Sequence, residues 1–175
     1  MSEQNRIETR DVDRTGWPTG PWDSEPDKVQ WVDERTGLDC LAVRQPDMGH
    51  WCGYVGVPDG HPWHGKDYDD VRVPNEDGDN GCPDVHGGLT FSDACDEGGR
   101  ICHVPQSGRP KNVWWLGFDC AHGGDRHPAH ARVALPSWVS DGAYRDLAYV
   151  EGSCRHLARQ AMRAAGSHRG GSDAG

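Results

Sequence analysis

The residues with the most reactive chemistry lie directly behind the largest apolar residues, in the stretch VWWLGFDCAHGGDRHPAH that begins at Val113. Asp119, His122 and Asp125 are spaced three apart, and the glycine pair between the last two permits a sharp turn. If VWWLGF is a strand buried through its tryptophans, the three side chains converge at its end. One imidazole with two carboxylates suits a divalent ion such as Zn, Mn or Mg. The alternative interpretation is that both aspartates cap turns and that His122 is a polar loop residue.

Three further histidines extend this prediction. His86 stands in VHGGLT, where a glycine pair again lets backbone approach a ligand closely. The string resembles the histidine-glycine-glycine-leucine element of metal-dependent serine/threonine phosphatases, whose histidine helps to bind a metal, although the other signatures of that family are missing. We therefore predict His86 as a fourth metal ligand. His61 and His64, three apart in HPWHG, are predicted as the general acid or base, and the alternative is an exposed loop.

Cysteine allows two other interpretations. Cys120 and His122 would share one face of an extended chain and form a Cys-His nucleophile, but Asp119 would then point away from them. A structural zinc site without a Cys-x-x-Cys knuckle would use four residues. These are Cys82, Cys95, Cys102 and His103. Cys40, Cys120 and Cys154 are expected to be buried thiols that act as small apolar residues.

Charge and composition disfavour some classes of function. The net charge of −10, with acidic residues concentrated between Asp67 and Asp84, disfavours a general nucleic-acid binder. The negative charge does not disfavour an enzyme that binds phosphate through a cation held by carboxylates, because the cation supplies the positive charge. The N-terminus carries no apolar signal segment, and no run reaches the length of a membrane span. We therefore expect a cytoplasmic protein with reduced thiols and no membrane partner.

The 175 residues are enough for one domain. We expect residues 1–25 to be a disordered N-terminal tail, residues 26–165 a single α+β domain, and residues 166–175 a disordered C-terminal tail. Aliphatic residues are few, but the eight tryptophans can each bury a large apolar surface. Such a thin core predicts help from a metal, a ligand or a partner subunit, which includes a homo-oligomer.

The expected fold is a small antiparallel sheet with long loops and one long C-terminal helix packed on it. KVQWVDE, LDCLAVRQ and HWCGYVGVP are separated by short breaks of turn residues, which predicts a meander. ICHVP is expected to pair with VWWLGFD. Apolar residues at spacings of three and four predict a helix from Asp141 to about Ala165, ended by Gly166.

Four strings together resemble a family of small proteins encoded by bacteriophages of actinobacteria and by related prophages. They are CGYVGVPDGHPWHGKDY, VHGGLTFS, ICHVP and WWLGFDCAHGGD, and the resemblance covers about Trp31 to Gln160. It implies a phage protein that works in the host cytoplasm. It carries over no activity and no catalytic residue.

Three functions are therefore expected. The first is a divalent-metal-dependent hydrolase of a phosphoester or nucleotide-like substrate, with the metal on His86, Asp119, His122 and Asp125. The second is a non-catalytic protein that sequesters a nucleotide or another small molecule by stacking it on tryptophan. The third is a host-interaction protein in which zinc only holds the loops.

Overall fold

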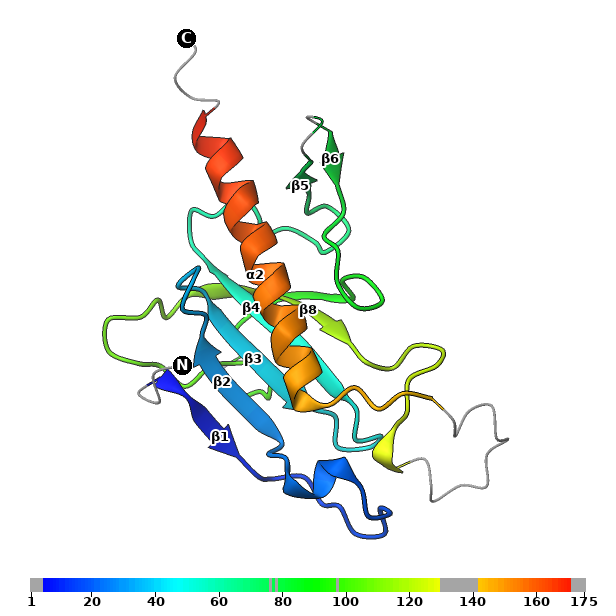
Figure 1. Cartoon of the computed structure of the whole chain (residues 1–175). Helices are drawn as coiled ribbons and strands as arrows, with labels where there is room; N and C mark the ends of the chain where they lie inside the picture. Colours follow the sequence, from blue (N-terminus) through cyan, green and yellow to red (C-terminus); the bar gives the residue numbers. More distant parts are fainter. Residues whose placement is uncertain (1–4, 76, 78, 97, 130–141, 171–175) are drawn as a thin grey trace.

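The computed structural model describes residues 5–75, 77, 79–96, 98–129 and 142–170 (Figure 1). Antiparallel pairing joins six strands in the order β1-β2-β3-β4-β8-β7. A two-stranded sheet and one long helix complete the predicted α+β fold. The strand bounds are β1 (Ile7–Thr9), β2 (Lys28–Val32), β3 (Asp39–Arg44), β4 (Trp51–Pro58), β5 (Val73–Pro74), β6 (Asn80–Gly81), β7 (Phe91–Ala94) and β8 (Val113–Asp119), and the helices are η2 (Pro21–Ser24) and α2 (Leu147–Gly170).

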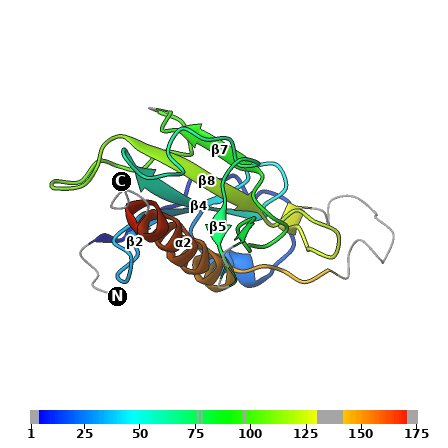
Figure 2. The same cartoon turned by 90° about the horizontal axis from the view of Figure 1, so that it is seen from above.

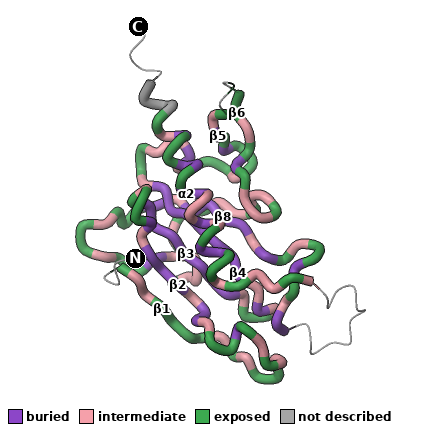
Figure 3. The backbone as a smooth tube through the Cα atoms, in the orientation of Figure 1, coloured by how far each residue is buried: buried purple, intermediate pink, exposed green. Residues whose placement is uncertain are grey.

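The predicted meander is confirmed as β2, β3 and β4, joined by short turns. Gly37 and Gly49 in these turns have φ values of 70° and 81°, the left-handed region that glycine enters without steric cost. Every residue of β3 is buried, because both faces of the central sheet are covered (Figure 3). Alternate residues of this strand belong to a large apolar cluster beneath α2 and to a smaller cluster on the opposite face.

Helix α2 covers one face of the sheet and packs on β3 and β4 (Figure 2). Val150, Cys154, Leu157 and Ala161 follow helical spacing and are fully buried. The close approach requires Gly53 on β4, where a Cβ atom would lie 2.8 Å from the Cys154 sulfur. Burial raises the pKa of the Cys154 and Cys40 thiols, so both act as apolar core residues, as predicted. No described helix is long and apolar enough to cross a membrane.

Two predicted elements differ from the structure. The helix begins at Leu147, residues 142–146 are not helical, and Asp141 lies outside the described residues. Gly166 does not end the helix, which continues to Gly170. This part of the expected C-terminal tail is therefore helical, and residues 171–175 are outside the described residues. ICHVP is a loop rather than a strand, and β7 occupies the edge beside β8 instead.

The N-terminal segment is not the tail that the sequence predicted. Ile7 pairs with Gln30 across the β1–β2 ladder, and Trp22 in η2 is buried. Residues 1–4 lie outside the described residues. The polar character of this segment arose from side chains that are paired internally: Arg14 donates to Asp27, which also accepts the backbone N–H groups of Asp11 and Val12.

A partly buried carboxylate, Glu25, connects this segment to the sheet and to the helix. Its Oε2 accepts from Arg44 Nη2 at 2.7 Å and from the Tyr144 hydroxyl at 2.5 Å, while Oε1 accepts the Leu147 N–H at 2.9 Å. Arg44 is fully buried and lies over the Trp51 ring. The Leu147 N–H is among those that lack a partner inside the helix, so Glu25 helps to set where α2 begins.

Replacing Glu25 with alanine should lower the free energy of unfolding by about 3 kcal/mol, because Arg44 would stay buried without its main partner. This is the lower end for breaking a buried pair, since Asp27 still lies 3.2 Å from Arg44 Nε. Urea denaturation would measure the change. Glu8→Ala is the matched control, because the ion pair of exposed Glu8 among the described residues is a surface pair with Arg6, and its loss should change stability by less than about 1 kcal/mol. Equal effects of the two variants would contradict the assigned role.

The same carboxylate predicts acid sensitivity. Burial alone would raise the pKa of Glu25, but its bonds from Leu147, Tyr144 and Arg44 outweigh burial and lower it from the ordinary value of 4.5. A lowered pKa adds stability above pH 4.5 that is lost as the pH falls through the folded-state value. Urea midpoints should therefore fall below this pH in the wild type, and the fall should be shallower in Glu25→Ala.

Candidate functional site

The predicted residues lie beside the start of α2: His86 in one loop, and Asp119, His122 and Asp125 at the end of β8 and in the turn after it. Asp119 ends β8, as predicted, and a turn closed by the Asp125 N–H and the His122 carbonyl follows it. Gly124 in this turn has a φ of 90°, which is the sharp reversal expected from the glycine pair. The loop that carries His86 lies against the same turn, where the His86 and His122 ring centroids are 5.5 Å apart.

Asp125 is the centre of the site and is buried. One carboxylate oxygen, Oδ2, lies 2.7 Å from His86 Nε2 and accepts the His122 N–H at 3.0 Å. The other, Oδ1, accepts Arg145 Nε at 2.9 Å. Burial alone would raise the pKa of Asp125, but the bonds from His86, Arg145 and the His122 backbone outweigh it and lower the pKa. Asp125 is therefore a carboxylate at neutral pH.

This carboxylate fixes the protons of His86. An ionised carboxylate only accepts hydrogen bonds, so His86 Nε2 carries the hydrogen that lies between it and Asp125. In the neutral ring Nδ1 is then the acceptor, and it lies 2.9 Å from the Tyr149 hydroxyl, which donates to it. The result is a continuous series of hydrogen bonds from the Tyr149 hydroxyl through the His86 ring to the Asp125 carboxylate.

Asp119 and His122 form a second pair beside this series. Asp119 Oδ1 lies 3.5 Å from His122 Nε2, and its Oδ2 accepts the Thr90 hydroxyl at 2.8 Å. His122 Nε2 is also packed against Gly87, where a Cβ atom would lie 1.9 Å from that nitrogen. The four predicted ligands are thus neighbours but are arranged as two pairs. Among the described residues, the ligand atoms that do gather within 4.8 Å of one another belong to Cys95, Cys102 and His103.

The structure does not bring His61 and His64 to this site. His61 Nε2 lies 2.9 Å from the Ala161 carbonyl, and its Nδ1 accepts the Trp63 N–H. Ala161 is twelve residues along α2 from Tyr149, or about 18 Å at the rise of an α-helix. Burial lowers the pKa of His61, and His64 lies near the Trp114 ring. The tight HPWHG turn folds onto the far part of the helix, so these histidines are separated from the residues that they were expected to assist.

His86 and Tyr149 open onto a groove of about 530 Å³ between the loop and the helix. His156, paired with Asp84 at 3.3 Å, and Ser153 also line it. Tyr149, Ser153 and His156 were not predicted from the sequence as residues of the site. Their spacing of four and three along the helix, on a face other than the apolar one, was the signal that marks a polar groove.

The structure distinguishes the two interpretations of the cysteines, a Cys-His nucleophile and a four-residue zinc site. Cys120 is 2% exposed and burial raises its pKa well above the ordinary value, which disfavours the Cys120–His122 nucleophile. Cys95 and Cys102 form a disulfide, which corrects the expectation that all thiols are reduced; the loop between them is short enough to bring them together. Cys82 is an exposed free thiol at the small sheet, apart from the other three predicted zinc ligands.

No protein-family model, curated protein or solved structure matches this chain. The resemblance to a phage protein family therefore stays a prediction, and so does a metal ion on His86, Asp119, His122 and Asp125.

The packing of His122 on Gly87 can be tested with two neighbouring glycines. Gly87 and Gly88 have φ values of 67° and 85°, so alanine at either position should cost about 1–2 kcal/mol in backbone strain. Only Gly87→Ala also meets the His122 ring, whereas a Cβ at Gly88 meets nothing within 4 Å. Gly87→Ala should therefore be less stable than Gly88→Ala in thermal melts and should shift the His122 ring signals in NMR spectra. Identical behaviour would show that the ring lies elsewhere.

Proposed function

We propose that this chain is a hydrolase of small phosphoesters in which the Tyr149 hydroxyl is the nucleophile and His86 is its general base. The observation that carries the proposal is the hydrogen-bonded series Tyr149–His86–Asp125 at the edge of a groove. A nucleophile within reach of a base, with the base oriented by a third group, is the arrangement that activates hydroxyl groups in enzymes.

The proposed reaction has two steps. The Tyr149 oxygen bonds to phosphorus while its proton moves to His86 Nδ1, and the bond from phosphorus to the leaving oxygen breaks. His86 returns the proton to the leaving oxygen, which departs as an alcohol. Water then attacks the tyrosyl phosphate and gives its proton to His86, which restores the Tyr149 hydroxyl and releases phosphate. Asp125 stays ionised throughout and stabilises the imidazolium that forms in each step.

The surroundings of Tyr149 favour an anionic phosphoryl group. The Arg145 guanidinium lies 4.9 Å from the Tyr149 ring centroid, and Asp125 holds it through Nε. Its terminal nitrogens donate to no described side chain or carbonyl, and we propose that they stabilise negative charge on phosphoryl oxygens. The net charge of −10 disfavours long nucleic acids, so we propose a small, nucleotide-like ester as the substrate.

Metal-dependent hydrolysis at the same site is the second candidate, favoured by the proximity of the two pairs of predicted ligands, His86 with Asp125 and Asp119 with His122. Binding an ion at His86 would require that ring to give up its bond to Asp125 or to Tyr149, because both nitrogens are in use. The stacking hypothesis has less support from the described residues, since five tryptophans are at most 2% exposed. These are Trp22, Trp31, Trp51, Trp63 and Trp115.

Hydrolysis of p-nitrophenyl phosphate and bis-p-nitrophenyl phosphate tests the proposal. Tyr149→Phe and His86→Gln should each lower kcat by about 100-fold or more, as expected for loss of a nucleophile or a general base. Tyr68→Phe is the matched control, because Tyr68 packs against the core and is not among the residues that line the groove, so this variant should keep full activity. Mass spectrometry of rapidly quenched wild type should find a phosphoryl group on Tyr149.

A chelator separates the two candidates. Activity that survives EDTA supports the tyrosine mechanism, whereas activity that is lost with EDTA and restored by Zn or Mn supports the metal centre. Full activity of Tyr149→Phe would remove the nucleophile from the proposal, and no turnover of either ester by the wild type would overturn it.

A further inference from the structure

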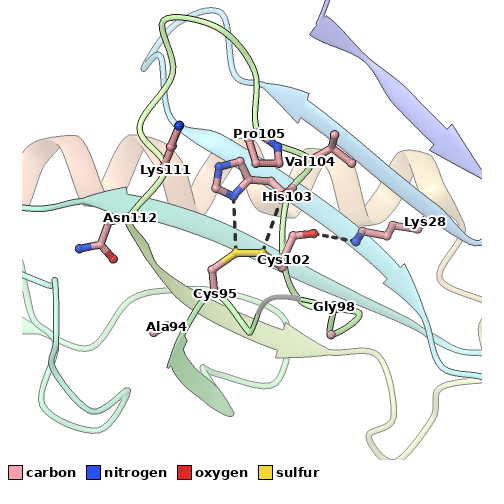
Figure 4. Close-up of a pocket in the computed structure, with 11 residues that line it drawn as sticks. Lys28, Ala94, Cys95, Gly98, Cys102, His103, Val104, Pro105, Lys111 and Asn112 are labelled. Atoms are coloured by element: carbon pink, nitrogen blue, oxygen red, sulfur yellow. Dashed lines mark hydrogen bonds between the residues drawn. A yellow bond between two sulfur atoms is a disulfide. The ribbon is translucent and has the colours of Figure 1, made fainter.

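A second cluster of reactive side chains lies on the face of the sheet opposite α2. Cys95, Cys102 and His103 stand at the wall of a cavity of about 660 Å³, where the His103 ring lies beside both sulfurs (Figure 4). One ligand atom from each residue lies within 4.8 Å of the other two. His103 is 4% exposed and packs edge-on against Trp115 of β8, which fixes its place.

The hydrogen bonds of His103 fix which nitrogen faces the sulfurs. Nε2 lies 3.0 Å from the Pro110 carbonyl, which can only accept, so Nε2 carries the ring hydrogen. Nδ1 therefore has its lone pair free, and it lies 3.8 Å from the Cys95 sulfur. Metal-binding histidines commonly donate their other N–H to a backbone carbonyl in this way, which orients the ring and makes it a better ligand.

The spacing of these atoms is close to that of a tetrahedral zinc site. With Zn–S near 2.3 Å and Zn–N near 2.0 Å, sulfur and nitrogen ligands stand roughly 3.6 Å apart and two sulfurs roughly 3.8 Å apart. The Cys95 sulfur and His103 Nδ1 are already at about this separation. The two sulfurs must move apart and the Cys102 sulfur must take its place around the same ion, which requires reduction of the disulfide.

We propose that Cys95, Cys102 and His103 bind Zn²⁺ in the reduced protein, with a fourth coordination position open to the cavity, and that the disulfide is the oxidised, metal-free state. Binding releases one proton from each thiol. A peroxide reverses it: two zinc-bound thiolates give two electrons to hydrogen peroxide, which takes up two protons and leaves as two waters. The sulfurs join, and Zn²⁺ is released because a disulfide offers no thiolate.

The open position distinguishes this site from a closed structural one. Structural zinc takes four protein ligands, whereas three ligands with an exchangeable water are typical of sites that bind or activate another molecule. The cavity next to the sulfurs is lined by Lys28, Lys111 and Asn112 and by no further cysteine, histidine or carboxylate among the described residues. Cys82, the fourth ligand that the sequence suggested, is not among the lining residues.

Zinc titration of the fully reduced wild type tests this inference, with 4-(2-pyridylazo)resorcinol as the competing chromophore. One equivalent should bind tightly. Co²⁺ in its place should give the strong visible bands of a tetrahedral ion and a thiolate-to-cobalt charge-transfer band. Hydrogen peroxide should release the metal and leave a protein lighter by two hydrogens, with a peptide map that joins Cys95 to Cys102.

The variants separate this site from other thiols and from the groove. Cys102→Ser and His103→Ala should lose stoichiometric binding, with circular dichroism to check that they fold. Cys82→Ser, the matched control with an exposed cysteine, and Tyr149→Phe should bind as the wild type does. If the reduced wild type binds no zinc, or if Cys82→Ser loses zinc as Cys102→Ser does, the inference is overturned. If His103→Ala does not fold, the cobalt spectra of the other two proteins test the inference. A thiolate-to-cobalt charge-transfer band in the wild type that is absent in Cys102→Ser supports the site, and a band that persists in Cys102→Ser contradicts it.

Discussion

The ion pair between Glu25 and the buried Arg44 is the interaction on which the rest of the arrangement depends. Arg44 is fully buried in β3, so its charge must be balanced inside the protein, and Glu25 and Asp27 from the N-terminal segment do so. Glu25 also accepts the first N–H of α2. One carboxylate therefore places the N-terminal segment, the central sheet and the start of the helix relative to one another.

The placement of the helix start in turn builds the groove. With Leu147 fixed, Arg145 lies just before the helix and Tyr149 in its first turn, where both face the two loops. Asp125 connects the two loops to the start of the helix, as Glu25 connects the N-terminal segment to it. Asp125 is a buried carboxylate that accepts hydrogen bonds from an arginine, from another side chain and from a backbone N–H. Both carboxylates are kept ionised by their donors, so the same physical device serves the fold and the proposed chemistry.

The sequence predicted what depends on local pattern and missed what depends on partners. Alternation and helical spacing located the meander, β8 and the helix, and the glycine pairs located the loops of His86 and His122. β1 has only three residues in a polar context, and its pairing depends on β2. ICHVP has a strand-like pattern, but a disulfide and the His103–Pro110 bond hold it as a loop. Tyr149 lies outside the apolar stripe, and only the folded structure shows its partner.

The two adjacent tryptophans of β8 explain how one strand supports both sites. Successive side chains of a strand point to opposite faces, so Trp114 packs towards the cluster beneath α2 and Trp115 towards the cluster on the other side. Trp115 contacts His103, while the same strand ends in Asp119 beside His122. The sheet separates the proposed zinc site from the proposed hydrolytic site. A change in the oxidation state of Cys95 and Cys102 can therefore reach the groove through the sheet, for example through β8 and its neighbour β7, whose last residue precedes Cys95.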